Sequence, residues 1–517
     1  MANKKTFASA ARAVPVTDTC NRAGGAAYSL ENRAALTQLA VTGCFNDTFY
    51  ATAQDQVTDV LRLAESVDTE YLANLAVYAR QKGYMKDAPA LLLALVAARD
   101  TALLSRVFGR VVDNGKMLRN FAQMIRSGVV GRKSLGTRPK KLVADWLNAA
   151  SDAQLLAASV GNAPSLGDVI RLAHPKAKDE TRAAMLGWLA GRPVEASKLP
   201  ALVRDLEAFR QGSSLEMPKV SFELLTSLQL SKADWTTIAC NASWQQTRMN
   251  LNTFLRQGVF EDKAMVELVA GRLRDAEQVG KARVFPYQLL AAYLNVNTDM
   301  PKKIVNALQD AMELAVANVP EFGVEAEVLV DVSGSMRSPV TGHRPGSTTK
   351  VRCVDVAGLF ASAVLRRNDD AIVTPFDTRV HAANLNARDS VVTNAEKLAR
   401  FGGGGTDCSC ALRELNRRES RARLVIYVSD NESWLNNRGW GRATAVMEEW
   451  AKYKRRVKGA KLVCIDITPN TTAQAQEAHD ILNVGGFSDE VFNLVGKFAR
   501  GEMTEDHWVD EIEKVEL

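Results

Sequence analysis

The stretch Asp331-Val-Ser-Gly-Ser335 directly follows the apolar run Ala326-Glu-Val-Leu-Val330, and this junction is the most informative part of the chain. A short run of this kind predicts a buried β-strand, and polar residues just beyond it lie at the strand's carboxyl end. Two later segments add similar side chains: Gly402-Gly-Gly-Gly-Gly-Thr406-Asp407, and Asp430 at the end of Leu424-Val-Ile-Tyr-Val-Ser-Asp. Together they predict one polar site built from three loops.

All the side chains of this predicted site offer hard oxygen donors. The candidate metal ligands are Asp331, Ser333, Ser335, Thr406 and Asp430. Mg²⁺ prefers such donors and keeps water or a ligand on its remaining positions, although Mn²⁺ and Ca²⁺ are alternatives. In isolation, the first five residues also fit a plain helix cap. A phosphatase-type nucleophile would want a second acid where Ser333 stands, which argues against phosphoryl transfer.

Beyond the junction Pro320-Glu-Phe-Gly-Val, apolar strands alternate with helices. The expected strands are Glu327–Val330, Ala371–Pro375, Leu424–Ser429 and Lys461–Ile467, and the expected helices are Lys350–Arg367, Ser390–Phe401, Ala443–Arg456 and Asp489–Ala499. Strands joined by helical crossovers are typical of a parallel doubly wound sheet, which binds ligands beyond the carboxyl ends of its strands. This half is therefore predicted to be an α/β domain.

The chain from about Ser29 to Val319 has the 3.6-residue periodicity of helices and almost no alternation of period two. Tyr71–Arg80, Leu91–Ala98 and Met117–Ile125 are examples, and Gly83 and Gly128 follow as stop signals. Helices of this length joined by short loops favour stacked antiparallel pairs, as in an α-solenoid. A compact helical domain is the alternative, because no strict sequence period is present. Trp146 and Trp188 are expected to anchor the helical core.

Composition excludes several classes of protein. The chain has 517 residues, 46% hydrophobic and 24% charged, and a net charge of +6, which is typical of a globular protein of several domains. No apolar stretch is long enough for a membrane span, and no secretory signal is apparent. The seven cysteines and five histidines show no zinc spacing. A cytoplasmic location with free thiols and no membrane partner is expected.

Positive charge is concentrated in one part of the helical half. Between Arg110 and Lys141 the chain carries nine Lys or Arg and a single acid, Asp113. Such an excess favours an anionic partner such as nucleic acid, whose phosphates Lys and Arg neutralise. A solvated helix start at Arg138-Pro139 is the simpler interpretation of part of this run.

The polar site resembles the metal-ion-dependent adhesion site of a von Willebrand factor A domain, in which a partner's carboxylate takes the open metal position. Arg126-Ser-Gly-Val-Val-Gly-Arg132 through Asp145-Trp146 resembles the signature of the TROVE module, which defines the Ro ribonucleoprotein autoantigen family. Asp168–Lys176 and Val284–Leu290 resemble two further family segments. The resemblance runs from about Arg22 through the A domain. One departure is that Ser151–Asp168 contains no Lys or Arg, whereas family members often have extra basic residues there.

The resemblance implies a mainly α protein: a ring of HEAT-like repeats over residues 20–319, followed by a metal-binding A domain over 324–517. It implies a monomeric ring that binds small noncoding Y-type RNA on its basic outer surface and takes single-stranded ends of misfolded RNA in its hole. An exoribonuclease is a further implied partner. The residues that match the family's RNA-binding positions are Arg132, Arg138, Lys140, Lys141, Arg171 and His174. For His174, which precedes Pro175, a helix-end role is the alternative.

Two other functions remain open from the sequence. The first is a protein-adhesion scaffold in which the Mg²⁺ site does the work and the basic residues are incidental. The second is a metal-dependent nuclease. It is not expected, because there is no second cluster of acids with a nearby base, so a non-catalytic protein is predicted.

Overall fold

The computed structural model of the chain describes residues 14–226, 228–282, 286–317, 319–344, 350–435, 442–503 and 507–517. Within these ranges the protein is mainly helical. The chain divides into two compact units. The first, here called the sheet unit, comprises residues 1–66, 274–296 and 305–511; the second, the helical unit, comprises residues 67–273, 297–304 and 512–517.

A five-stranded parallel sheet forms the centre of the sheet unit. Its strands are β3 (Ala326–Asp331), β4 (Ile372–Phe376), β5 (Leu424–Ser429), β6 (Lys461–Asp466) and β8 (Ile481–Gly485). They lie in the order β4-β3-β5-β6-β8, and every neighbouring pair is parallel. All six residues of β3 and of β5 are buried, as expected for strands covered on both faces.

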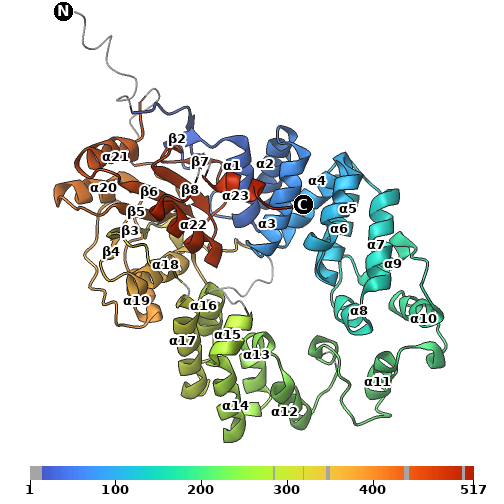
Figure 1. Cartoon of the computed structure of the whole chain (residues 1–517). Helices are drawn as coiled ribbons and strands as arrows, with labels where there is room; N and C mark the ends of the chain where they lie inside the picture. The colour runs from blue at the N-terminus through green and yellow to red at the C-terminus, as the bar shows by residue number, and fades with distance from the viewer. Residues whose placement is uncertain are drawn as a thin grey trace, which may run out of the picture. The chain divides into compact units, whose positions relative to one another are not determined.

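Helices cover both faces of this sheet, which makes it doubly wound (Figure 1). The helices are α16 (Pro286–Asn295), α18 (Cys353–Arg367), α19 (Val391–Leu398), α20 (Cys408–Arg417), α21 (Ala445–Arg456) and α22 (Asp489–Arg500). On one face, Trp450 and Tyr453 of α21 pack in a cluster with Val425 of β5. On the other face, Phe360 of α18 stacks on Phe492 of α22 with ring centroids 4.3 Å apart. The predicted α/β class is confirmed.

The N-terminal segment belongs to the sheet unit, and its two strands come before the region of helical periodicity, which begins at about Ser29. Strands β1 (Thr19–Cys20), β2 (Ala26–Ser29) and β7 (Thr472–Ala473) form a small antiparallel sheet. Helices α1 (Asn32–Thr42) and α2 (Ala53–Glu65) follow, and α1 contacts β8. The strands β1 and β2 are too short to produce a detectable alternation. The helices α15 (Ala276–Ala282) and α17 (Lys302–Val316) come before β3, and α23 (His507–Glu513) lies near the C-terminus.

The helical unit consists of helices that stack in two layers. Its helices are α3 (Thr69–Gln81), α4 (Asp87–Arg99), α5 (Thr101–Val111), α6 (Gly115–Arg126), α7 (Thr137–Ala149), α8 (Asp152–Ala158), α9 (Leu166–Ala173), α10 (Glu180–Leu189), α11 (Ala201–Arg210), α12 (Lys232–Asn241), α13 (Trp244–Arg256) and α14 (Lys263–Leu273). Helix α5 packs on α3 and α7, and α7 packs on α9; α6 likewise packs on α4 and α8. Packing between alternate helices is the arrangement of an α-solenoid (Figure 1).

Sequence signals set the limits of individual helices in this unit. Helix α6 begins at the Asn114 cap, whose side chain accepts hydrogen bonds from the N–H groups of Lys116 and Met117. Its buried residues include Leu118, Phe121 and Ile125, which recur at helical spacing on one face. The predicted helices at 71–80, 91–98 and 117–125 all fall within α3, α4 and α6.

The boundaries of the two compact units differ from the predicted domain limits at residues 319 and 324. Those limits describe modules of the sequence, and they remain a prediction. Among the elements that were not predicted are one strand and one helix of the α/β part, β8 and α20. Strand β8 contains Asn483, whose amide donates to the Ala475 carbonyl and the Glu477 carboxylate, so its apolar run is interrupted. Helix α20 buries Leu412 and Leu415, but the other residues that it buries, such as Cys408 and Ala411, are small. The start of the Val284–Leu290 motif lies outside the described residues.

Candidate metal centre and nucleic-acid face

The predicted metal ligands lie at the carboxyl edge of the sheet, where its winding direction changes. From β3 the chain passes to β4 on one side and then returns to β5 on the other. In such sheets the crevice between these two strands is the usual ligand site. Val330 of β3 pairs with Val428 of β5, so Asp331 and Asp430 emerge from neighbouring strands.

The five predicted ligands are all buried and come from the three predicted loops. Asp331, Ser333, Ser335, Thr406 and Asp430 are each at most 5% exposed. The Oγ atoms of Ser333 and Ser335 lie 3.2 Å apart. The carboxylate of Asp331 accepts hydrogen bonds from the Ser333 N–H at 2.8 Å and from the Ser429 hydroxyl at 2.6 Å. The structure thus fixes Asp331 and leaves lone pairs on its oxygens for a cation.

Close backbone packing between two loops holds the site together. The N–H of Gly403 donates to the Val332 carbonyl at 2.8 Å, and the N–H of Gly334 donates to the Gly404 carbonyl at 2.9 Å. Gly402 has a φ of +71°, and a Cβ atom there would collide with the Val332 carbonyl oxygen. Only glycine combines this positive φ with so close an approach to Val332, so position 402 of the glycine run requires glycine.

The electrostatics of the site favour a bound cation. Burial, together with the neighbouring carboxylate of Asp430, raises the pKa of Asp331 to about 7. Burial likewise raises the pKa of Asp430 to about 6, and that of Glu432 to about 7. None of these three carboxylates has an ion-pair partner among the described residues. A divalent cation would provide the missing positive charge.

Three further residues of this site escaped the sequence analysis. Ser429 lies in the quoted strand but points its hydroxyl at Asp331, and Glu432 has a buried, unpartnered Oε1 atom. Tyr50 comes from the segment between α1 and α2, and its hydroxyl lies near Ser335 and Asp430. Burial and the nearby Asp430 raise the pKa of Tyr50 to about 12. Tyr50 is far in sequence from the predicted metal ligands, so no local pattern indicates that it lies beside them.

The donor set matches a hard cation and not a zinc-type site. Two buried carboxylates and three buried hydroxyls are the donors that Mg²⁺ prefers. Among the residues that the structure describes, no group of three or more His, Cys, Asp or Glu side chains is arranged to hold a metal. All seven cysteines are free thiols.

The basic residues predicted to bind RNA lie in the helical unit, mostly at the start of α7. Arg138 and Lys141 are exposed and Lys140 is half-buried. Neither Arg138 nor Lys140 has a side-chain partner within the described residues, and Lys141 pairs only with Asp145, at 2.7 Å and with both side chains more than half exposed. Such an exposed pair contributes little stability, so Lys141 can exchange its partner for a phosphate.

Arg132 and Arg171 make more structural contacts than the sequence suggested. Arg132 is half-buried and donates to the Ala97 carbonyl at 2.8 Å, which ties its loop to the end of α4. Arg171 is exposed, yet it donates to Asp168 at 2.8 Å and to the Ala190 carbonyl at 2.7 Å. Arg171 therefore presents only part of its guanidinium to solvent.

His174 lies just beyond α9 and is exposed. It caps the helix in the left-handed conformation, with φ of 44°, which corresponds to the helix-end alternative and leaves the ring free. Helix α9 packs on α7, and the Asn148 amide of α7 donates to the Lys176 carbonyl at 2.9 Å. The structure thus places the α9 loop by the C-terminal end of α7, whereas Arg138, Lys140 and Lys141 lie near its N-terminal end, about 10–15 Å away along the axis.

Trp146 and Trp188 are half-buried, so their predicted role as core anchors is not confirmed. The buried positions of α7 are Pro139, Val143 and Leu147.

Comparisons with known proteins find similar sequences over most of the chain. Residues 327–499 match the family described as the Ro60 vWA domain. The chain is 26% identical to the RNA-binding protein RO60 of Deinococcus radiodurans, over 93% of this chain and 95% of that protein. It is 22% identical to the RNA-binding protein RO60 of Caenorhabditis elegans, over 54% of this chain and 43% of that protein.

The fold is similar to that in the crystal structure of the Deinococcus radiodurans RO (RSR) protein, with a TM-score of 0.63 and 22% sequence identity, over 92% of this chain and all of that one. The predicted fold class, a helical part followed by a von Willebrand factor A domain, is confirmed. Among the described residues, no helix is both long and apolar enough to cross a lipid bilayer.

Proposed function

We propose that this chain, whose resemblance to the Ro proteins is confirmed by sequence and by fold, is a non-catalytic RNA-binding protein. The observation that carries the proposal is the group of available cations at the start of α7: Arg138 and Lys140 have no partner among the described residues, and Lys141 has only an exposed one. Two relatives that are named RNA-binding proteins support the same function.

The start of α7 is suited to phosphate for a second reason. Its N-cap is Gly136, and no side chain caps the helix. The first N–H groups of a helix lack partners within the helix, and the helix dipole places partial positive charge there. Phosphate oxygens can accept from these N–H groups while Arg138, Lys140 and Lys141 neutralise the charge. Because such contacts ignore base identity, the binding is expected to be sensitive to salt and tolerant of sequence.

The RNA that this face binds is proposed to be small, noncoding and Y-type, as the resemblance to the Ro family implies. By the same argument, the single-stranded end of misfolded RNA enters the hole of a monomeric ring, and an exoribonuclease acts on RNA so held. A cytoplasmic location belongs to this proposal. The exposed His174 and the exposed part of Arg171 would contact the same RNA at the far end of α7.

The metal site is proposed to hold Mg²⁺ through Asp331, Ser333, Ser335, Thr406 and Asp430. When bound, the cation supplies an open coordination position for a carboxylate of a partner protein. The protein's own part is to keep these donors enclosed and fixed: Ser429 and the Ser333 N–H orient Asp331, and the glycine run positions Thr406.

The set of fixed oxygen donors at this site also favours a second candidate function, a Mg²⁺-dependent protein-adhesion scaffold without a primary role in RNA binding. Capture of a protein that needs Mg²⁺, is lost in Asp331→Ala and persists after nuclease treatment would favour the scaffold.

The test of RNA binding is a salt titration with full-length variants. In the triple variant Arg138→Gln, Lys140→Gln, Lys141→Gln, the slope of log K against log salt for a small structured RNA should fall by about 2, because each phosphate contact contributes about 0.7–0.9.

A second variant, His174→Gly, removes the imidazole ring and places glycine at a left-handed backbone position, which glycine adopts readily. The affinity for RNA should fall, and the melting temperature of the protein should stay unchanged.

The matched control is the triple variant Lys198→Gln, Lys232→Gln, Lys263→Gln, which removes the same charge from other exposed positions of the helical unit. It should retain the wild-type slope. Equal slopes for the two triple variants would refute the assignment of RNA binding to α7.

A further inference from the structure

A pocket of about 1100 Å³ lies at the edge of the main sheet opposite the candidate metal site. Its lining comes largely from the residues that lead into the strands. Val324 and Glu325 precede β3, Asp370 precedes β4, Arg423 precedes β5 and Lys458 precedes β6. Since the strands are parallel, all of these residues lie at the amino edge, whereas Asp331 and Asp430 lie at the carboxyl edge. The pocket is therefore separate from the metal site, and it lies wholly within the sheet unit.

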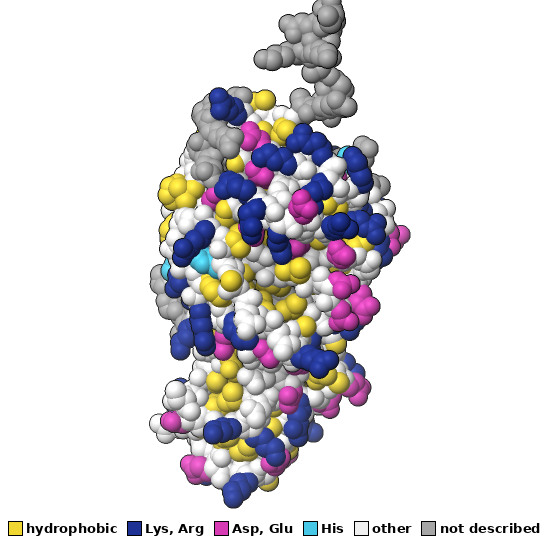
Figure 2. Space-filling model, turned by 90° about the vertical axis from the view of Figure 1, so that its left-hand side faces the viewer, with side chains coloured by type: hydrophobic (Ala, Val, Ile, Leu, Met, Phe, Trp, Pro, Cys, Tyr) yellow, Lys and Arg dark blue, Asp and Glu magenta, His cyan; other side chains and the backbone are white. Residues whose placement is uncertain are grey.

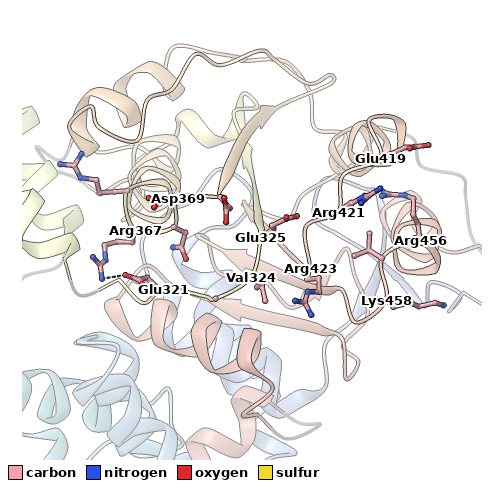
Figure 3. A pocket seen from close by; sticks show the side chains of 15 residues that line it. Glu321, Val324, Glu325, Arg367, Asp369, Glu419, Arg421, Arg423, Arg456 and Lys458 are labelled. Atoms are coloured by element: carbon pink, nitrogen blue, oxygen red, sulfur yellow. Dashed lines mark hydrogen bonds and ion pairs between the residues drawn. The ribbon is translucent and has the colours of Figure 1, made fainter.

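The balance of charge changes along this edge: acids outnumber the cations Arg366 and Arg367 in front of β4 and β3, and cations outnumber Glu419 in front of β5 and β6. The segments in front of β4 and β3 contribute the acids Asp369, Asp370 and Glu325. The segments in front of β5 and β6 contribute Arg421, Arg423 and Lys458. Figure 3 shows Asp369 and Arg367 toward one end of the pocket, and these three cations, together with Arg456 and Glu419, toward the other. One end of the pocket is thus a cationic surface.

The cations at this end are available, unlike their neighbours in sequence. Arg417 and Arg418 pair with Glu414 and Glu327, at 2.6 Å each. In contrast, the exposed side chains of Arg421, Arg423 and Lys458 have no hydrogen-bond or ion-pair partner among the described residues. Three adjacent unpaired cations repel one another, and an anionic ligand that contacts all of them would relieve that repulsion.

Arg456 adds a fixed guanidinium to this surface. It donates to the backbone carbonyls of Ser420 and Leu415, and its guanidinium carbon lies 4.9 Å from the centre of the Tyr453 ring. These contacts hold the side chain in place while it remains exposed. An ordered guanidinium loses less entropy when it binds an anion than a mobile one does.

We propose that Arg421, Arg423, Arg456 and Lys458, here called the amino-edge cluster, bind the phosphate backbone of single-stranded RNA. The sheet unit would then hold an RNA site of its own, in addition to the site proposed on α7, and this inference rests on the proposed RNA-binding function. Figure 2 views the molecule from the side of α20 and α21, where Lys and Arg side chains gather in the upper half.

The chemistry of the lining favours a nucleic-acid backbone over a protein or a membrane. Of the described residues that line the pocket, the apolar ones are Val324 and Val457, and none is aromatic. A protein partner normally meets aromatic or apolar anchors, and a membrane-binding surface presents apolar side chains beside its cations. Without aromatic rings, bases cannot stack here, so the contacts are to phosphates and independent of sequence.

The test uses fluorescently labelled oligouridine and full-length protein in a salt titration. In the variant Arg421→Gln, Arg423→Gln, Lys458→Gln, the slope of log K against log salt should fall by about 2, because each contact with a single strand contributes about 0.7. Affinity near 0.1 M salt should fall by roughly 10- to 100-fold on the same basis. Ultraviolet crosslinking should place the RNA on peptides that contain residues 418–423 and 457–461, and this signal should disappear in the variant.

The matched control removes three exposed or half-buried cations from the same unit, outside the pocket: Lys397→Gln, Lys497→Gln, Arg500→Gln. It should bind like the wild type. If the amino-edge variant keeps wild-type slope and affinity while the α7 triple variant loses them, the inference is wrong and the proposed function stands. If the wild type does not bind the RNA at any salt concentration, the proposed function itself fails. Loss of an acidic protein partner with RNA binding intact would also overturn the inference.

Discussion

At the scale of single residues, the candidate metal site encloses carboxylates that have no ion-pair partner in the part of the chain that the structure describes. Asp331 and Asp430 are 0% and 2% exposed, and burial raises the pKa of both. An enclosed charge of this kind destabilises the fold unless it is neutralised by a proton or a cation. Proton and metal therefore compete for the same oxygens.

This competition predicts a pH-dependent response to Mg²⁺. The folded pKa values of about 7 and about 6 lie above the usual value for aspartate. The stabilisation by protonation is thus complete below about pH 4 and is lost as pH rises to about 7. Across that window the metal-free melting temperature should fall, and the increase in melting temperature caused by Mg²⁺ should grow. Thermal unfolding with Mg²⁺ or with a chelator, between pH 5 and 8, measures both effects.

The matched comparison for this prediction is Asp331→Asn, which retains the size of the side chain and removes one charge. It should reduce both the pH dependence and the response to Mg²⁺. A wild-type melting temperature that ignores Mg²⁺ at pH 8 would contradict the assignment of the metal site.

At the scale of elements, the N-terminal segment supports the loop that carries Asp430. The Asn21 amide donates to the Ser433 carbonyl at 2.8 Å, and the N–H of Ala23 donates to the Glu432 carboxylate at 2.9 Å. Strand β2 continues this contact by pairing with β7. Residues more than 400 positions away in sequence thus fix the position of one metal ligand.

Gly25 is the position at which this contact can be broken by a single methyl group. A Cβ atom at Gly25 would collide with the backbone carbonyl oxygen of Ser433, which cannot move aside as a flexible side chain can. Gly25→Ala should destabilise the protein by about 1–3 kcal/mol and weaken Mg²⁺ binding, with RNA binding by the helical unit retained. Chemical denaturation and calorimetric titration with Mg²⁺ measure the two effects.

The neighbouring Gly24 provides the control, because a Cβ atom there meets nothing within 4 Å. Gly24→Ala should cost only the backbone strain of its φ of +83°, about 1 kcal/mol, and leave Mg²⁺ binding unchanged. Equal Mg²⁺ affinities in the two variants would show that the N-terminal segment does not support the site.

The elements with a strong local pattern could be predicted from sequence, and those set by distant contacts could not. The apolar run of β3 predicts a buried strand, and the helical spacing of apolar residues in α6 predicts a helix. The position of Tyr50 beside the metal site depends on tertiary packing that no local pattern encodes. The same limit applies to Arg132: its charge suggested RNA binding, but its hydrogen bond to the Ala97 carbonyl is visible only in the structure.

At the scale of the whole molecule, the net charge is only +6, but the positive charge is concentrated in two separate cationic surfaces. One lies at the start of α7 in the helical unit, and the other is the amino-edge cluster of the sheet unit. Each consists of exposed cations with few competing partners within the described residues. Each surface would add phosphate contacts of its own, and these contacts do not depend on base sequence.

The measurement that tests the central claim most directly is the sequencing of RNA that co-purifies with the native protein, alongside the Arg138→Gln, Lys140→Gln, Lys141→Gln variant. Small structured noncoding RNA should be enriched over total cellular RNA with the wild type, and this enrichment should be lost with the variant. A wild-type sample whose RNA matches total cellular RNA in composition, or contains none, would contradict the account.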